Sequence, residues 1–95
     1  MKLRWTAPAL RDFEEIGAFI ASDNSAAAAR TVAAIFDAAE KLVQHHHVGR
    51  PGRIAETREL IVARTPFVVP YRVRGDEVQI LAVFHGAQRW QEGLG

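Results

Sequence analysis

Apolar residues recur at two different spacings along the chain, and the change between them divides the sequence in two. From residue 7 to residue 46 they stand three or four positions apart, which is the spacing of one face of an α-helix. From residue 59 to residue 84 they form alternating or short runs rich in β-branched and aromatic side chains, as strands do. A short alternating segment, Lys2–Trp5, precedes the helical part. The pattern predicts an α+β protein with an N-terminal strand, a helical hairpin and then three strands.

Capping residues mark the boundaries of the two helices. Thr6 or Ala7 is expected to cap the first helix, because Pro8 then falls in the first turn, where its missing N–H is not needed. The polar cluster at residues 22–25 ends this helix and caps a second one, expected from about Ser25 to His46. Because the connection is so short, the two helices should pack as a hairpin.

Three apolar runs after the helices predict an antiparallel meander. They are Glu59–Ala63, Phe67–Val73 and Val78–Phe84. Gly75-Asp76, between the last two runs, is a two-residue hairpin signal. Pro70 cannot donate to a strand ladder, so a bulge or an unpaired position is expected there. With the first strand, the meander gives a four-stranded, mostly antiparallel sheet that carries both helices on one face.

Nine apolar residues at inward positions are expected to form the core. They are Phe13, Ile16, Ile35, Phe36, Leu42, Val62, Val69, Ile80 and Val83. A period of two in the middle strand places Val69 inside and turns Pro70 to the other face. If the ring of Phe36 is buried, truncation to alanine would cost about 3–5 kcal/mol.

Length and composition limit the classes to which the protein can belong. With 95 residues the chain is expected to form one domain, residues 1–90, followed by a flexible tail at residues 91–95. The chain is 48% hydrophobic and 24% charged, and no apolar run approaches the roughly 20 residues of a membrane helix. No secretory signal is visible, so a cytoplasmic protein without a membrane partner is expected. The absence of cysteine excludes disulfides and thiolate chemistry.

Three consecutive histidines, His45–His47, are the feature that most suggests a metal site. Consecutive helical residues point about 100° apart, so these side chains cannot converge on one ion. At a helix C-terminus they would instead interact with the helix dipole. A P-loop, a nucleophile elbow and a dinucleotide fingerprint are absent from the sequence. We therefore expect no metal and no cofactor.

Charge is distributed unevenly, although the net charge is only +1. Residues 1–47 carry five Lys or Arg against six Asp or Glu, whereas residues 48–95 carry seven Arg, no Lys and five Asp or Glu. Arginine is preferred for flat, bidentate contacts to carboxylate or phosphate, so the second part is the expected binding side. A nearly neutral protein is a weak candidate for affinity that depends on many phosphate contacts.

Four segments within Gly49–Trp90 are distinctive in combination: GRPGR, TREL, the strand from TPF to YRV, and HGAQRW. Together with TAPALRDFEEIGAFI near the start and the order of the elements, they resemble the RelE/ParE superfamily of toxins from bacterial type II toxin–antitoxin pairs, and its ParE-like branch in particular. The resemblance implies a toxin that a cognate antitoxin binds and neutralises. Proteins of the ParE branch are known for poisoning DNA gyrase, whereas those of the RelE branch cut mRNA in the ribosomal A site.

Two functions follow from this resemblance. The first is a non-enzymatic toxin that inhibits gyrase by binding. The second is a ribosome-dependent mRNA endonuclease, in which His85 would transfer a proton and Arg64 would stabilise the charge on phosphorus. Toxins of the mRNA-cutting kind usually carry an arginine early in the strand that reads Phe67–Val69 here, and this chain is apolar there. We therefore favour binding, with His85 ending a strand half-buried.

Contacts with partners are expected on an apolar surface flanked by arginines. The expected residues are Arg58, Phe67, Tyr71, Arg72, Arg89 and Trp90. Such a patch is larger than a small monomer usually exposes. An antitoxin would cover it by adding a strand or laying down a helix, giving a toxin–antitoxin hetero-oligomer. The gyrase, or the ribosome with its mRNA in the alternative, is the second expected partner.

Overall fold

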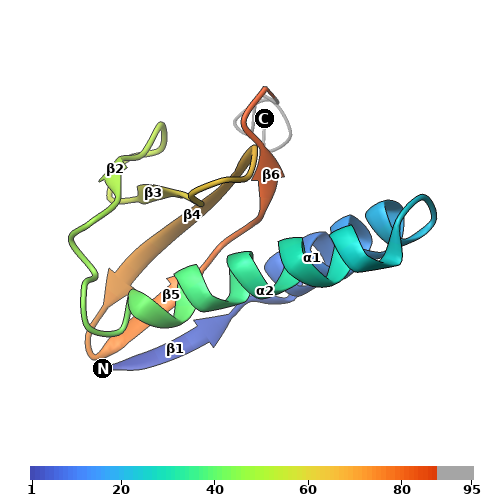
Figure 1. Ribbon diagram of the computed structural model, residues 1–95. Helices are drawn as coiled ribbons and strands as arrows, with labels where there is room; N and C mark the ends of the chain where they lie inside the picture. The colour runs from blue at the N-terminus through green and yellow to red at the C-terminus, as the bar shows by residue number, and fades with distance from the viewer. Residues whose placement is uncertain (88–95) are drawn as a thin grey trace.

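The computed structural model describes residues 1–87 of the chain. A strand, β1 (Lys2–Trp5), is followed by two helices, α1 (Ala7–Ala21) and α2 (Ser25–Lys41). Five strands complete the fold: β2 (Arg50–Pro51), β3 (Arg58–Ile61), β4 (Phe67–Arg74), β5 (Glu77–Ile80) and β6 (Phe84–His85). In Figure 1 the two helices run antiparallel as a hairpin whose tip extends beyond the sheet. The predicted α+β order is confirmed.

The strands form one mixed sheet in the order β1-β5-β4-β3-β2, and β6 pairs with β4. β1 is parallel to β5, and the other pairs are antiparallel. Between β4 and β5, Gly75 has a φ of 58°, which fits the first central position of a type II′ hairpin turn. The predicted hairpin is therefore confirmed, while β2 is a short additional strand that the sequence pattern did not indicate.

The last predicted strand is divided into β5 and β6 by a bulge opposite Pro70. Tyr71 pairs with Ile80 of β5, and Val68 pairs with Phe84 of β6. Between these pairs, the two β4 residues Val69 and Pro70 face three residues, 81–83, which is a bulge. The N–H of Leu81 donates to the Pro70 carbonyl at 2.9 Å, but proline has no N–H to return. The Thr6 hydroxyl instead lies 3.4 Å from the Leu81 carbonyl. The disturbance expected at Pro70 is confirmed, and proline is its physical cause.

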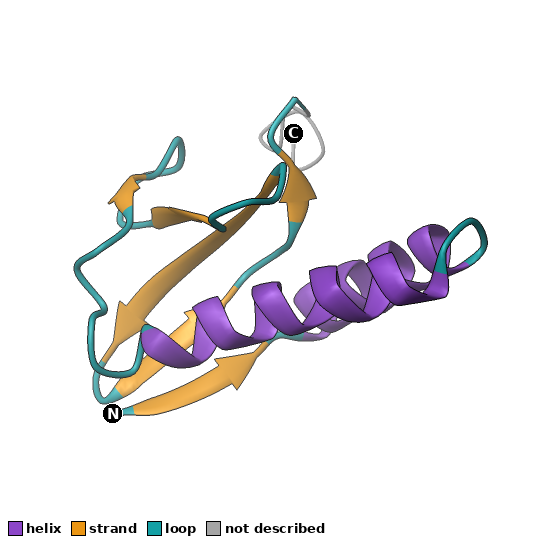
Figure 2. Ribbon diagram, in the orientation of Figure 1, coloured by secondary structure: helices purple, strands orange, loops and turns teal. Residues whose placement is uncertain are grey.

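Both helices lie on the same face of the sheet (Figure 2). Each begins at a side chain that caps its N-terminus. The Thr6 hydroxyl accepts the Ala9 N–H at 3.4 Å at the start of α1. The Asn24 carboxamide oxygen accepts the Ala27 N–H at 2.9 Å at the start of α2. α2 ends at Lys41, earlier than the predicted His46. After Lys41 the backbone N–H groups of residues 42–44 donate to carbonyls three residues back rather than four. The His46 carbonyl accepts the Tyr71 hydroxyl at 2.8 Å.

The core lies between the hairpin and the sheet. Its buried members are Ala9, Ile35, Ala39, Leu42, Val62, Phe67, Val69, Tyr71, Val78, Ile80 and Val83. Of the predicted core residues, Phe13 and Ile16 are partly buried against this cluster. Pro70 is also buried. Its register partner Glu59 lies on the same face of the sheet, where Arg50 and Arg53 of the segment 50–57 bind the Glu59 carboxylate.

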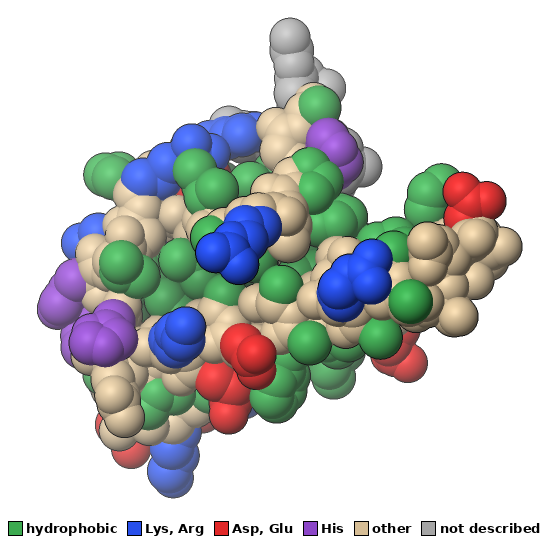
Figure 3. Space-filling view, in the orientation of Figure 1, with side chains coloured by type: hydrophobic (Ala, Val, Ile, Leu, Met, Phe, Trp, Pro, Cys, Tyr) green, Lys and Arg blue, Asp and Glu red, His purple; other side chains and the backbone are tan. Residues whose placement is uncertain are grey.

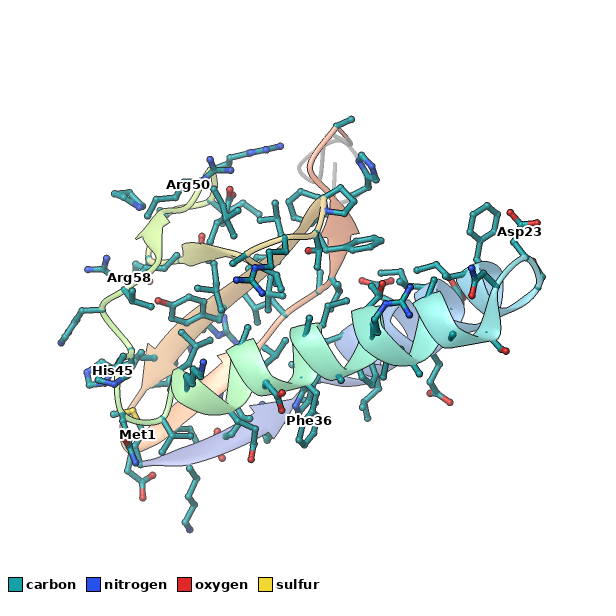
Figure 4. All side chains as sticks on the ribbon, in the orientation of Figure 1. Met1, Asp23, Phe36, His45, Arg50 and Arg58 are labelled. Carbon is teal, nitrogen blue, oxygen red and sulfur yellow. The ribbon has the colours of Figure 1, made fainter. Side chains whose placement is uncertain are left out.

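Phe36 is the predicted core residue that the structure contradicts. It is 45% exposed, and Figure 4 shows it projecting outward from α2. α2 turns Ile35 and Ala39 toward the sheet, and the next residue along a helix points about 100° away. The prediction for Phe36 is therefore wrong. An apolar stripe on a helix does not show which of its residues face the sheet and which lie at the edge of the buried face.

Candidate binding site on the open face of the sheet

We call the face of the sheet opposite the helices the open face. Because Val69, Tyr71, Val78 and Ile80 face the core, the alternate strand positions face away from it. The register places six polar side chains there: Lys2, Arg4, Arg72, Arg74, Glu77 and Gln79. Four of the six are basic: Arg72 and Arg74 come from the arginine-rich second part of the chain, and Lys2 and Arg4 come from β1.

A row of hydrogen bonds crosses three strands of the open face. Arg4 Nε donates to Glu77 Oε1 at 3.3 Å, and Gln79 Nε2 donates to the same oxygen at 2.8 Å. Arg72 Nε donates to Gln79 Oε1 at 2.7 Å. The hydrogen bond from Gln79, together with attraction to Arg4, lowers the pKa of Glu77. The Arg74 side chain is exposed and makes no hydrogen bond or ion pair within residues 1–87.

A buried carboxylate holds residues 50–57 over the open face. Glu59 is 1% exposed, and its Oε1 accepts Arg50 Nη2 at 2.9 Å and Nε at 3.3 Å. Its Oε2 accepts the backbone N–H of Arg53 at 3.1 Å. The Arg53 guanidinium lies 5.5 Å from the centre of the Phe84 ring. These charge-assisted bonds offset the cost of burying Glu59 and fix the loop.

A cavity of about 660 Å³ opens between this loop, β4 and the start of α1. It is lined by Thr6, Pro8, Asp12, Ile54, Ala55, Glu56, Thr57, Arg72, Arg74, Leu81 and Ala82. The Asp12 carboxylate accepts the Val83 N–H at 3.0 Å, and burial raises its pKa while that hydrogen bond opposes the rise. Glu56 has a φ of 65°, a conformation that costs energy in residues other than glycine. The volume suits a small ligand or the side chains of a bound peptide.

On the opposite face, Tyr71 joins β4 to the loop after α2. Its buried hydroxyl donates to the His46 carbonyl at 2.8 Å and accepts the Gly49 N–H at 2.9 Å. Burial raises the pKa of Tyr71, and the Gly49 bond opposes this. A Cβ at Gly49 would lie 2.6 Å from the Tyr71 oxygen, so this position requires glycine. Arg58 Nη1 donates to the Gly49 carbonyl at 2.8 Å and reinforces the same loop.

His85 lies at the other end of the sheet, on β6. It is exposed rather than half-buried as expected, and its Nδ1 accepts the Ala87 N–H at 3.1 Å. Its ring meets the Phe67 ring edge-on, with centroids 5.9 Å apart. Arg64 lies in the turn between β3 and β4 with a φ of 66°.

The structure therefore separates the residues that were expected to form one partner surface. Tyr71 is fully buried and Phe67 is 9% exposed, so the expectation that they form an exposed apolar patch is wrong. Both are inward residues of β4, where strand alternation directs them to the core. Arg72 lines the cavity, and Arg58, the first residue of β3, reaches the loop after α2. Arg89, Trp90 and the tail at 91–95 lie outside the described residues.

Sequence reasoning missed several residues that shape the open face. Asp12, Gln79 and Arg74 were not singled out, because their roles depend on strand register and on the return of the chain near α1. Glu59 was not singled out either, although it is buried and pairs with Arg50 and Arg53. Its position between two arginine-rich segments was the available signal.

Metal binding and membrane insertion find no support in residues 1–87. No group of three His, Asp or Glu side chains in this part of the chain could hold a metal ion. Within the same residues, neither helix is long and apolar enough to cross a membrane.

The two layers of the molecule carry opposite charge. The hairpin, residues 7–41, has three Lys or Arg against six Asp or Glu, a formal charge of −3. The remaining described residues, 1–6 and 42–87, have eight against four, a formal charge of +4. Figure 3 shows Lys and Arg side chains following the loop around β2 and acidic side chains along the hairpin. An anionic partner is therefore attracted to the sheet rather than to the helices.

A helical hairpin on one face of a small mixed sheet is an architecture that this chain shares with solved chains from toxin–antitoxin systems. The chain belongs to one such family, described as "ParE toxin of type II toxin-antitoxin system, parDE", which matches residues 3–90. It is 48% identical over 93 residues to "Putative toxin Y4kP" of Sinorhizobium fredii (strain NBRC 101917 / NGR234), covering 98% of this chain and 96% of that protein.

Two solved structures share the fold. A chain of the chromosomal ParDE toxin–antitoxin system from P. aeruginosa has a TM-score of 0.79 and 32% identity, covering 90% of this chain and 95% of that one. A chain of the RelBE2 toxin–antitoxin complex from Mycobacterium tuberculosis has a TM-score of 0.64 and 26% identity, covering 92% of each chain. The predicted membership of the RelE/ParE superfamily is confirmed.

Proposed function

We propose that this ParE-family toxin arrests growth by binding DNA gyrase in the cytoplasm, without enzymatic chemistry, and that a cognate antitoxin neutralises it. The antitoxin is supported by the family and by the similar solved structures, which come from toxin–antitoxin systems. The gyrase target is what the ParE-like resemblance implies.

One observation favours binding over RNA cleavage. Toxins that cut mRNA usually carry an arginine early in the strand that corresponds to β4, where a cation can stabilise charge on phosphorus. Here that segment is Phe67, Val68 and Val69, with exposures of 9%, 4% and 0%. The strand start therefore contributes apolar side chains to the interior rather than a cation to a substrate.

Two assays run in parallel test this proposal. Purified toxin is added to gyrase with relaxed plasmid, and separately to translating ribosomes whose mRNA is examined by primer extension. We expect supercoiling to be inhibited, mRNA to remain intact, and added antitoxin to restore supercoiling. Cleavage at codon boundaries with gyrase unaffected would replace the proposal with the endonuclease function.

A further inference from the structure

We propose that this chain associates with itself head to tail, with the tip of the helical hairpin of one copy, led by Phe19, entering the cavity on the open face of a second copy. The inference goes beyond the proposed function, because it concerns the toxin alone. It assigns one occupant to two features that the fold leaves exposed, an apolar ring at the hairpin tip and an apolar cavity flanked by arginines.

Phe19 is the most exposed large apolar side chain among residues 1–87. It is 80% exposed, whereas the next, Val48, is 64% exposed. Phe19 lies in the last turn of α1, at the hairpin tip, which extends beyond the sheet in Figure 1. The sheet therefore does not cover the ring. Burial of this ring in a second copy would remove a large apolar area from water.

Hydrogen bonds within the turn hold the hairpin tip in a fixed shape. Ser22 Oγ donates to the Phe19 carbonyl at 2.7 Å, and the Asn24 N–H donates to the Ile20 carbonyl at 2.8 Å. The Asn24 side chain then caps α2. Phe19 is therefore presented on a preformed turn, which loses less conformational entropy on binding than a flexible segment would.

Acidic side chains flank the Phe19 ring. Glu15 precedes Phe19 by four residues, so both lie on the same face of α1. Asp23 follows in the turn, and Figure 4 shows it at the tip of the hairpin. Both carboxylates are exposed, and neither makes a hydrogen bond or ion pair within residues 1–87. A surface that complements this tip must offer an apolar pocket with cationic donors at its rim.

The cavity on the open face provides the apolar pocket. Its volume of about 660 Å³ is sufficient for a phenylalanine side chain and part of the turn that carries it. Pro8, Ile54 and Leu81 supply apolar walls, and the small side chains of Ala55 and Ala82 leave room between them.

Arginines of the same cavity provide the cationic donors. Arg74 lines it without an ion pair among residues 1–87, and Arg72 uses only its Nε, which donates to Gln79. Two acids, Asp12 and Glu56, also line the cavity, and the Asp12 carboxylate accepts a backbone N–H. Over the whole molecule the hairpin has a formal charge of −3 and the sheet layer +4, so attraction between two copies brings a hairpin to an open face.

The two surfaces lie at different places on one copy. Phe19 is in the last turn of α1, whereas the cavity borders the first turns of α1 at Pro8 and Asp12. One copy can therefore offer its tip while its own cavity stays open. A contact between two different patches is heterologous, so it continues into a row of copies or closes into a ring.

The first test is sedimentation of the full-length toxin, without antitoxin, over a range of concentrations. We expect the average mass to rise with concentration. Phe19→Ala and Arg74→Glu should each raise the dissociation constant about tenfold or more. Phe36→Ala, which removes a half-exposed ring of the hairpin away from the tip, should change it less than about twofold. Thermal melts confirm that the variants fold.

A mixing experiment is specific to the head-to-tail arrangement. Phe19→Ala removes the tip but keeps the cavity, whereas Ala55→Trp fills the cavity but keeps the tip. At a concentration where the wild type associates, each variant alone should be monomeric. Their equimolar mixture should form a dimer, because one intact tip meets one intact cavity. Ala33→Trp, at an exposed position of α2, should associate as the wild type does.

Three results would overturn the inference. The first is a wild-type toxin that stays monomeric at the highest concentration at which it dissolves. The second is association that Phe19→Ala and Phe36→Ala weaken equally, and the third is a mixture of Phe19→Ala and Ala55→Trp that remains monomeric. Because these measurements use the toxin alone, none of the outcomes depends on whether gyrase is the target.

Discussion

At the residue scale, Tyr71 shows how one side chain determines where a helix ends and a loop begins. Its hydroxyl satisfies both the His46 carbonyl and the Gly49 N–H in the interior. The phenol was expected at a partner surface, although the period of two that places Val69 inside also turns Tyr71, two residues later, to the core. The expectation for Tyr71 was therefore inconsistent with the predicted strand register.

Replacing Tyr71 with Phe should lower the free energy of unfolding by about 1–3 kcal/mol, because two buried backbone groups lose their partner. Urea denaturation checks this. A change near zero would mean that water replaces the hydroxyl and that the loop is not held by this side chain.

His85 is the residue that distinguishes the two toxin mechanisms most simply. If the toxin acts by binding, His85→Ala should leave growth arrest largely intact, since no proton transfer is lost. The measurement is the growth of cells that express the variant without antitoxin. Loss of toxicity in a variant that still folds and binds antitoxin would indicate that the toxin acts by catalysis through His85.

At the scale of elements, the sequence located the strands and helices well because each has a local signal. Thr6 caps α1, Gly75 forms the β4–β5 turn, and Pro70 marks the bulge, all as local chemistry requires. The end of α2 and the exposure of Phe36 were missed, since both depend on packing between elements. The cavity could not be predicted, because its walls come from segments far apart in the chain.

Adjacent residues of α2 provide a matched pair for testing the packing of this helix. Ile35→Ala should cost about 2–5 kcal/mol, because it empties a fully buried site. Phe36→Ala should cost about 1 kcal/mol or less, because the ring is half exposed. Denaturation midpoints of the two variants give the comparison. The reverse order would show that α2 is rotated relative to the sheet.

The contact of α1 with the bulge predicts a pH dependence. Burial raises the pKa of Asp12 above its ordinary value of 3.8, so the folded state holds this proton more tightly than the unfolded state. The stability contributed by Asp12 is therefore full below pH 3.8 and is lost as pH rises through the raised pKa. Asp12→Asn should flatten this part of the stability profile while its amide oxygen keeps the bond to Val83. A profile identical to wild type would exclude Asp12 as its source.

At the scale of the whole molecule, the separation of charge is the property most relevant to partners. The hairpin carries a formal charge of −3 and the remaining described residues carry +4. The nearly neutral net charge is therefore the sum of an acidic layer and a basic layer. The sequence indicated the basic part through its arginines, but not that Arg72 and Arg74 lie on the face opposite the acidic hairpin. That arrangement depends on the helices packing on one face only.

The most direct test of a toxin that works by binding is a titration of gyrase with toxin at several fixed gyrase concentrations, with supercoiling rate as the readout. A binding inhibitor occupies the enzyme that it inhibits, so the toxin concentration for half inhibition should rise in proportion to gyrase once gyrase exceeds the dissociation constant. Inhibition should also be complete within the binding time and reversed by antitoxin. Progressive inactivation of excess gyrase by substoichiometric toxin, or no inhibition at any ratio, would contradict the account.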